Sequence, residues 1–211
     1  MSDYHHDGAL ERRFKALERD LLLDGGAQIS TTRNYNFAIV PYDTKQEFAL
    51  RRHVSALSGK LRDAGWITAT IALSTLLVQR VQSMGDDAVA SLIAREKRLH
   101  RRDPVRALDE VEEKLIQLVE GREGLAADVA REIEKLALEH PEDRDRMVVF
   151  IGRAGSLYPF FRTSTLLKHL AGSTYNLPVI LLFPGHPVGD TGLSFMHQMP
   201  TDHDYRPRIY R

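Results

Sequence analysis

Histidine and aspartate side chains gather near the end of the chain, where they could bind a metal ion. The chain has nine histidines in all. The members of this cluster are His186, Asp190, His197, Asp202, His203 and Asp204. Metal ligands need spacings that let them converge, and these match no H-E-x-x-H or comparable motif. The chain also lacks cysteine. We therefore expect no metal site, no thiolate chemistry and no cofactor.

A serine hydrolase would place its nucleophile at a tight turn between a strand and a helix. The candidate here is G-R-A-G-S at 152–156. This differs from the G-x-S-x-G pattern, so its serine would not lie at the turn. Paired carboxylates for acid–base catalysis are missing from the same region, where Asp190 stands nearly alone. We assign no catalytic residue and expect that the protein is not an enzyme.

Four polar residues could still contact a ligand: Tyr42, Asp43, Arg162 and Asp190. Arg162 lies where a loop becomes a helix, so it could meet a carboxylate or a phosphate, or form an internal salt bridge or cap. Asp43 follows the first expected strand, where nucleotide-binding folds carry their phosphate loop. This segment, PYDTKQEF, contains no glycine, so it cannot wrap a phosphate closely. Asp43 either caps the following helix or makes a functional contact.

Two apolar runs, 147–152 and 177–185, have to position these residues. A segment of helix length joins them, which predicts two buried parallel strands. In such sheets function usually lies in the loops at the carboxyl ends of the strands. Here these loops are 152–162 and 183–190.

The rest of the chain alternates helices and strands. A stripe of Leu10, Phe14, Leu17 and Leu21 predicts a helix over 8–23. A strand follows at 36–40, then a helix at 44–64, a strand at 66–73 and another helix. The order αβαβα is typical of a three-layer α/β domain.

The segment 85–141 is helical, highly charged and has no strand candidate. Apolar stripes on both sides of Gly121 and Gly124 predict that its last two helices form an antiparallel hairpin. We interpret 85–141 as an insertion that either covers the sheet or protrudes as an arm for a partner.

The terminal residues 205–211 are unusual because Tyr205, Ile209 and Tyr210 stand between arginines. We expect an ordered strand there, which Pro207 would restrict to an edge of the sheet. The whole predicts one α/β domain, 1–211, with a mostly parallel sheet of four or five strands. It would be Rossmann-like, or like a P-loop NTPase without the P-loop.

The bulk composition is balanced, with 29 Lys and Arg against 29 Asp and Glu. The chain has no net positive charge that would attract nucleic acid or membranes, so such contacts would need a local patch of basic residues. The basic run 97–102 is a weak candidate, because a solvated helix end has the same composition. No apolar run approaches the ~20 residues that span a bilayer. We expect a soluble cytoplasmic protein that binds no membrane.

Several strings together resemble the BrxB family of bacteriophage-exclusion (BREX) systems, over essentially the whole length. They begin with Pro41-Tyr42-Asp43. The others are F-I-G-R-A-G-S-L-Y-P-F-F-R-T-S-T-L-L (150–167), P-V-I-L-L-F-P-G (178–185), G-L-S-F-M (192–196) and Y-R-P-R-I-Y (205–210). Each string alone is weak, and the set is fairly specific.

The resemblance implies a role in a multi-protein system that methylates host DNA and restricts phage. Such proteins have no assigned enzymatic activity and look like a nucleotide-binding α/β fold without the phosphate loop. The implied partners are the PglZ alkaline-phosphatase-like protein first, then the BrxC ATPase and the PglX methyltransferase, with DNA contacted only indirectly.

Three functional hypotheses follow. The first is an interaction subunit that uses the loops 153–162 and 184–190, the C-terminal segment or the helical arm. Its candidate contact residues are Tyr158, Phe160, Arg162, Pro184, Gly185, Tyr205, Arg206, Arg208 and Tyr210. The second is a cryptic nucleotide-binding or hydrolytic protein at the carboxyl ends of the strands. The third is a subunit that contacts DNA through its terminal arginines and the run 97–102.

Overall fold

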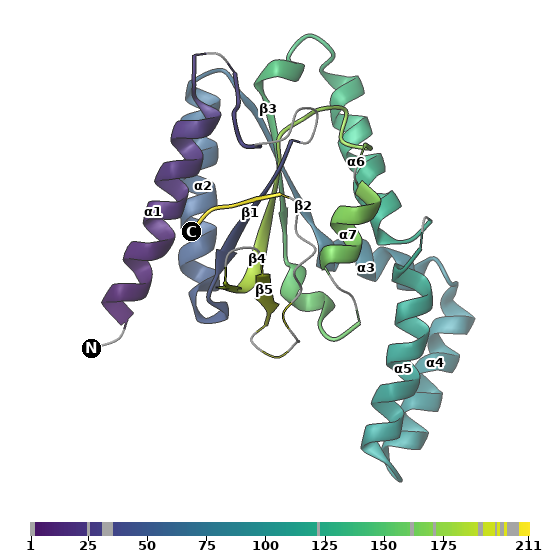
Figure 1. Ribbon diagram of the computed structural model, residues 1–211. Coiled ribbons are helices and arrows are strands. Elements are labelled where there is room, and N and C mark those ends of the chain that lie inside the picture. The colour runs from purple at the N-terminus through teal and green to yellow at the C-terminus, as the bar shows by residue number, and fades with distance from the viewer. Residues whose placement is uncertain are drawn as a thin grey trace.

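The computed structural model is a three-layer α/β sandwich with a helical arm (Figure 1). It describes residues 3–24, 26–30, 36–121, 123–160, 163–170, 172–189, 192–196, 198, 201 and 207–211. The strands are β1 (Phe37–Tyr42), β2 (Ile67–Ala72), β3 (Met147–Gly152), β4 (Val179–Val188), β5 (Gly192–Phe195) and β6 (Arg208–Ile209). No helix in these ranges is long and apolar enough to cross a membrane.

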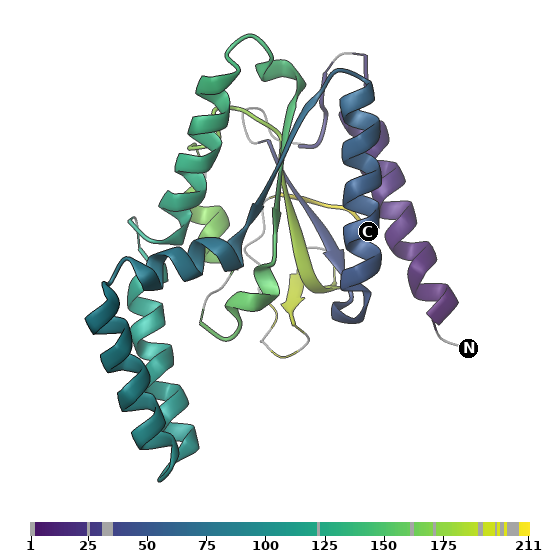
Figure 2. The same cartoon turned by 180° about the vertical axis from the view of Figure 1, so that it is seen from behind.

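The helices fall on both faces of the sheet. The α-helices are α1 (Asp3–Leu21), α2 (Glu47–Asp63), α3 (Leu73–Gln82), α4 (Asp86–His100), α5 (Pro104–Val119), α6 (Leu125–Glu139) and α7 (Thr163–Leu170). Three short 3₁₀ helices, η1 (Thr44–Gln46), η2 (Arg144–Arg146) and η3 (Ala154–Leu157), flank them. Helices α1 and α2 cover one face, and α3, α6 and α7 cover the other (Figures 1 and 2).

The sheet has the order β2-β3-β4-β1-β6, and all of these neighbours pair in parallel. The parallel pairing of 147–152 with the run that forms β4 is confirmed, as is a mostly parallel sheet in an α/β fold. Strand β4 continues beyond the end of β1 and pairs in antiparallel fashion with β5. The chain crosses from β1 to β2 over the face that carries α2. It crosses from β2 to β3 and from β3 to β4 over the other face (Figure 2). These crossovers therefore all have the same handedness.

The sheet is buried because alternate residues of each strand enter two separate cores. Phe37 and Ile39 of β1 pack against α3, α6 and α7, whereas Ala38 and Val40 pack against α1 and α2. Strands β3 and β4 divide their side chains in the same way. A strand with helices on both faces has to be apolar throughout, which explains the two uninterrupted runs in the sequence.

Helices α4 and α5 lie side by side and form an arm that extends away from the sheet (Figures 1 and 2). An ion pair between Arg95 Nε and Glu110 Oε2, 2.6 Å long, joins them. The predicted hairpin of α5 with α6 is therefore wrong: α5 pairs with α4. Helix α6 lies on the sheet instead, with Val129 and Ile133 in the core. An apolar stripe shows that a helix has one face to bury, but it does not identify the element that covers this face.

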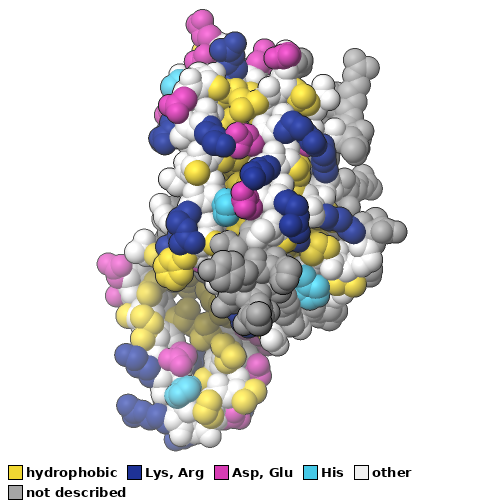
Figure 3. Space-filling model, turned by 90° about the vertical axis from the view of Figure 1, so that its left-hand side faces the viewer, with side chains coloured by type: hydrophobic (Ala, Val, Ile, Leu, Met, Phe, Trp, Pro, Cys, Tyr) yellow, Lys and Arg dark blue, Asp and Glu magenta, His cyan; other side chains and the backbone are white. Residues whose placement is uncertain are grey.

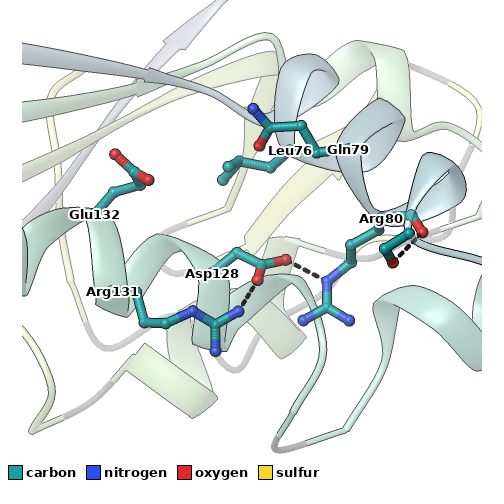
Figure 4. Close-up of a pocket in the computed structure, with 7 residues that line it drawn as sticks. Leu76, Gln79, Arg80, Asp128, Arg131 and Glu132 are labelled. Atoms are coloured by element: carbon teal, nitrogen blue, oxygen red, sulfur yellow. Dashed lines mark hydrogen bonds and ion pairs between the residues drawn. The ribbon is translucent and has the colours of Figure 1, made fainter.

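Arg80 of α3 holds the junction between the arm and the sheet (Figure 4). Its Nη1 donates to the carbonyl oxygen of Leu118 at 3.0 Å, and its Nη2 donates to that of Gly124 at 2.6 Å. Its Nε also pairs with Asp128 of α6. The side chains of Arg80 and Asp128 are only 18% and 14% exposed. One guanidinium group thus ties α3 to the turn that links α5 with α6.

The C-terminal segment is held by a buried carboxylate on α1. Strand β6 pairs with β1 at one side of the sheet, as the sequence predicts for an edge strand. Beyond it, the Tyr210 hydroxyl donates to Asp20 Oδ2 at 3.1 Å, and Arg208 Nη2 lies 2.7 Å from the same oxygen. Asp20 is 4% exposed. Burial, together with Asp20, raises the pKa of the Tyr210 phenol, while Arg208 opposes this shift. We name these three residues the Asp20 clamp.

The Asp20 clamp predicts a measurable loss of stability when its hydroxyl is removed. Tyr210→Phe deletes a hydrogen bond to a buried charged group and should lower the free energy of unfolding by about 1.5 kcal/mol in urea denaturation. The control Lys15→Ala changes an exposed side chain on α1, the helix that carries Asp20. It should lower the free energy of unfolding by less than about 0.5 kcal/mol. An unchanged denaturation midpoint for Tyr210→Phe would show that the clamp does not hold the C-terminal segment.

Arg80 and Arg131 provide a second, matched test because both pair with Asp128. Arg80→Met leaves the carbonyl oxygens of Leu118, Glu123 and Gly124 without their donor and removes one of the two arginine partners of the largely buried Asp128 carboxylate. We therefore expect a loss of about 2–4 kcal/mol in unfolding free energy. Arg131 is 60% exposed, so Arg131→Met should cost less than about 1 kcal/mol. Equal losses for the two variants would contradict the role assigned to Arg80.

Candidate interaction surface at the carboxyl ends of the strands

Loops from three neighbouring strands meet at the carboxyl end of the sheet. They follow β1 at Asp43 and β3 at Arg153, and β4 reaches this level at Pro184, which lies opposite Tyr42 in the parallel register. We name this region the carboxyl-end surface. It contains the described parts of the two loops that the sequence singled out, 152–160 and 183–189, so the parallel strands bring these parts together.

The loop after β1 is closed by its own side chains. Asp43 Oδ1 accepts a hydrogen bond from the backbone N–H of Lys45 at 2.9 Å, so Asp43 caps η1. The Tyr42 ring is buried, and its hydroxyl donates to Glu47 Oε2 at 2.7 Å. Burial and this bond raise the pKa of the Tyr42 phenol. The place of a phosphate loop is therefore taken by a capped helical turn.

Glu47 is the centre of a charged network that was not foreseen from the sequence. Besides Tyr42, its carboxylate pairs with Arg51 Nε at 3.3 Å and with Arg153 Nη1 at 3.2 Å. Arg51 lies one turn further along α2, whereas Arg153 comes from the loop after β3. We name Tyr42, Glu47, Arg51 and Arg153 the Glu47 network. It fixes the start of α2 against a loop more than a hundred positions later in the chain.

The loop after β3 begins with a backbone that is uncommon outside glycine. Arg153 has a φ of 61°, in the left-handed region. The Ser156 hydroxyl donates to the Arg153 carbonyl at 2.6 Å, which braces the turn. The loop contains a cis peptide bond between Tyr158 and Pro159. Tyr158 is 37% exposed and its ring centre lies 6.5 Å from that of Phe195, while Phe160 is half-buried.

The hairpin of β4 and β5 closes the other side of this surface. Gly185 lies so near β5 that an added Cβ would come within 2.0 Å of the Ser194 carbonyl oxygen. Pro184 is buried, and its carbonyl accepts from the Met196 N–H at 2.8 Å. The F-P-G string thus lets β5 pack closely against β4. Its Pro and Gly contribute backbone shape and have no exposed functional groups.

The other predicted residues divide into two groups. Arg208 and Tyr210 belong to the Asp20 clamp, where Tyr210 is 3% exposed and its ring lies 4.8 Å from the Arg208 guanidinium. Arg162, Asp190, Tyr205 and Arg206 lie outside the described residues. Within the described part of the chain, no three His, Asp or Glu side chains are grouped to hold a metal ion. Of the histidine and aspartate cluster, only His186 is described.

Figure 4 shows a hollow lined by charged side chains at the junction of α3 and α6, away from the carboxyl-end surface. It measures about 350 Å³ and is lined by Arg80, Asp128, Arg131 and four further residues. The three charged side chains named are paired with one another. We attribute this hollow to the structural junction at the base of the arm.

Comparison with known proteins gives one match. The family model of the BREX protein BrxB matches residues 69–209, which is more than half of the chain. No curated protein and no solved structure matches. The matched range contains the loops after β3 and β4, the arm and β6, whereas α1, β1 and α2 precede it. The chain therefore belongs to the BrxB family of BREX proteins.

Proposed function

We propose that this protein is a non-catalytic assembly subunit of a BREX defence system. In this role it binds the PglZ alkaline-phosphatase-like component, with the BrxC ATPase and the PglX methyltransferase as further contacts. It thereby supports host DNA methylation and phage restriction while touching DNA only through its partners. Membership of the BrxB family supports the part that concerns the BREX system.

The rest of the proposal is supported by one observation: polar side chains of the carboxyl-end surface are paired with one another. In parallel α/β sheets a small ligand binds at this end, against backbone N–H groups and unfilled space. Here Asp43 caps η1 and Glu47 joins Tyr42 to two arginines. These polar groups are used to fix the loops to one another. Fixed loops with exposed aromatic and arginine side chains are what a protein partner recognises.

Co-purification tests the assembly role. With an affinity tag on this chain and the complete system expressed, we expect the PglZ-like component to elute in a near-stoichiometric complex that survives size-exclusion chromatography. A chain that elutes alone, while the same cells still resist phage, would overturn the proposal.

The nucleotide-binding alternative makes an opposite prediction at Asp43. Asp43→Asn keeps an oxygen that can accept the Lys45 N–H, so the cap and the fold are retained, but it removes the negative charge. An assembly subunit should retain both its complex and full phage resistance. Loss of resistance with the complex intact would favour the alternative instead.

A further inference from the structure

Phe48 is the most exposed large apolar side chain in the described part of the protein, at 72%. It lies in the first turn of α2, beside Glu47, and points away from the stripe of Leu50, Leu57 and Leu61 that packs on the sheet. Phenylalanine is a poorer helix former than lysine or glutamate, and in water it gains nothing from burial. Packing against the sheet therefore does not explain an aromatic ring at this position.

The ring is held in a defined environment. The Arg51 guanidinium lies over it, 5.3 Å from the ring centre, and Glu47 binds the same guanidinium at 3.3 Å. Glu47 also pairs with Arg153, so the arginine that lies over the ring shares its carboxylate with the loop after β3. Less side-chain entropy is then lost when a partner covers these residues.

The charged side chains beside Phe48 carry more positive than negative charge. The carboxylate of Glu47 is shared by Arg51 and Arg153, so the trio carries a net charge of +1 by side-chain type. The side chains of Arg51 and Arg153 are 47% and 44% exposed. Two partly exposed guanidinium groups beside an exposed aromatic ring match an apolar side chain that has a carboxylate next to it. Arginine and large aromatic residues are also typical of interface hot spots.

Nucleic acid fits this site less well. Lys, Arg, Asp and Glu side chains are interspersed over the face formed by α1 and α2 (Figure 3). On that face Lys15 pairs with Glu11 and Lys60 pairs with Glu18. Nucleic-acid binding needs a run of positive charge that can meet several phosphates. One excess charge beside a ring favours a protein segment.

We propose that Phe48, Arg51 and Arg153 form a docking site for an acidic segment of a protein partner, in which an apolar side chain covers Phe48 and a neighbouring carboxylate meets the two arginines. This inference rests on the proposed function, since the partner is taken to be a BREX component. Phe48 and Arg51 precede the range that the family model matches, so the site is assigned from this chain alone.

The test compares variants in the complex formed with the tagged chain in cells that express the complete system. The docking variants are Phe48→Ala and Arg51→Ala. The matched control is Val105→Ala with Arg106→Ala, which alters an apolar side chain that is 70% exposed and a neighbouring arginine on the arm. We expect Phe48→Ala to raise the dissociation constant for the co-purified component by at least about 10-fold, and Arg51→Ala to raise it as well. The control should bind like the wild type.

The outcomes separate the two proposals. If the wild-type chain binds no BREX component, the proposed function fails and this site fails with it. If the wild type binds and Phe48→Ala binds equally well, the proposed function stands and the docking site is refuted. Urea denaturation of each variant shows whether the fold is retained. The site is also refuted if Phe48→Ala and Arg51→Ala reduce binding to a 30-base-pair DNA duplex and leave the protein complex unchanged.

Discussion

A parallel sheet has to be covered on both faces, and this requirement determines most of the architecture. Strand β4 hydrogen-bonds to β1 on one side and β3 on the other, and its side chains enter both cores. Each parallel neighbour needs a crossover, and each crossover places a helix on a face. The chain satisfies this with α1 and α2 on one side and α3, α6 and α7 on the other. The same geometry collects the loops after β1, β3 and β4 at one end.

Two charged centres connect parts of the chain that are distant in sequence. The Asp20 clamp joins α1 to the C-terminal segment, and the Glu47 network joins α2 to the loop after β3. The Asp20 carboxylate is buried and that of Glu47 is half-buried. Removing a carboxylate from water is costly unless its oxygens are paired, and both groups have arginine and tyrosine partners. The first centre holds the segment that follows β6, and the second fixes the loops of the carboxyl-end surface to one another.

Much of the fold could be predicted from the sequence because its signals are periodic. The uninterrupted apolar runs indicated buried parallel strands, and Pro207 placed the last strand at an edge. The partner of α5 could not be predicted, because amphipathic helices of similar length and charge are interchangeable as neighbours. In the structure α6 covers the sheet, whereas α4 and α5 extend away from it (Figure 1).

The candidate site was predicted only in part. The loops could be located because they follow the apolar runs, and the lack of glycine after Val40 argued against a phosphate loop. Glu47 and Arg153 are ordinary charged residues in the sequence, and their contact depends on how β1 and β3 align in space. Phe48 did leave a signal, since it lies off the apolar stripe of its helix, but a single exposed ring is not a periodic feature.

We propose that the carboxyl-end surface, and not the arm, meets the partner. Hydrogen–deuterium exchange of the chain alone and in its BREX complex measures this directly, because backbone amides covered by a partner exchange more slowly. We expect protection of peptides that span 43–52 and 153–160, with unchanged exchange in the arm over 89–115. Protection confined to the arm, or absent from both loops, would contradict it.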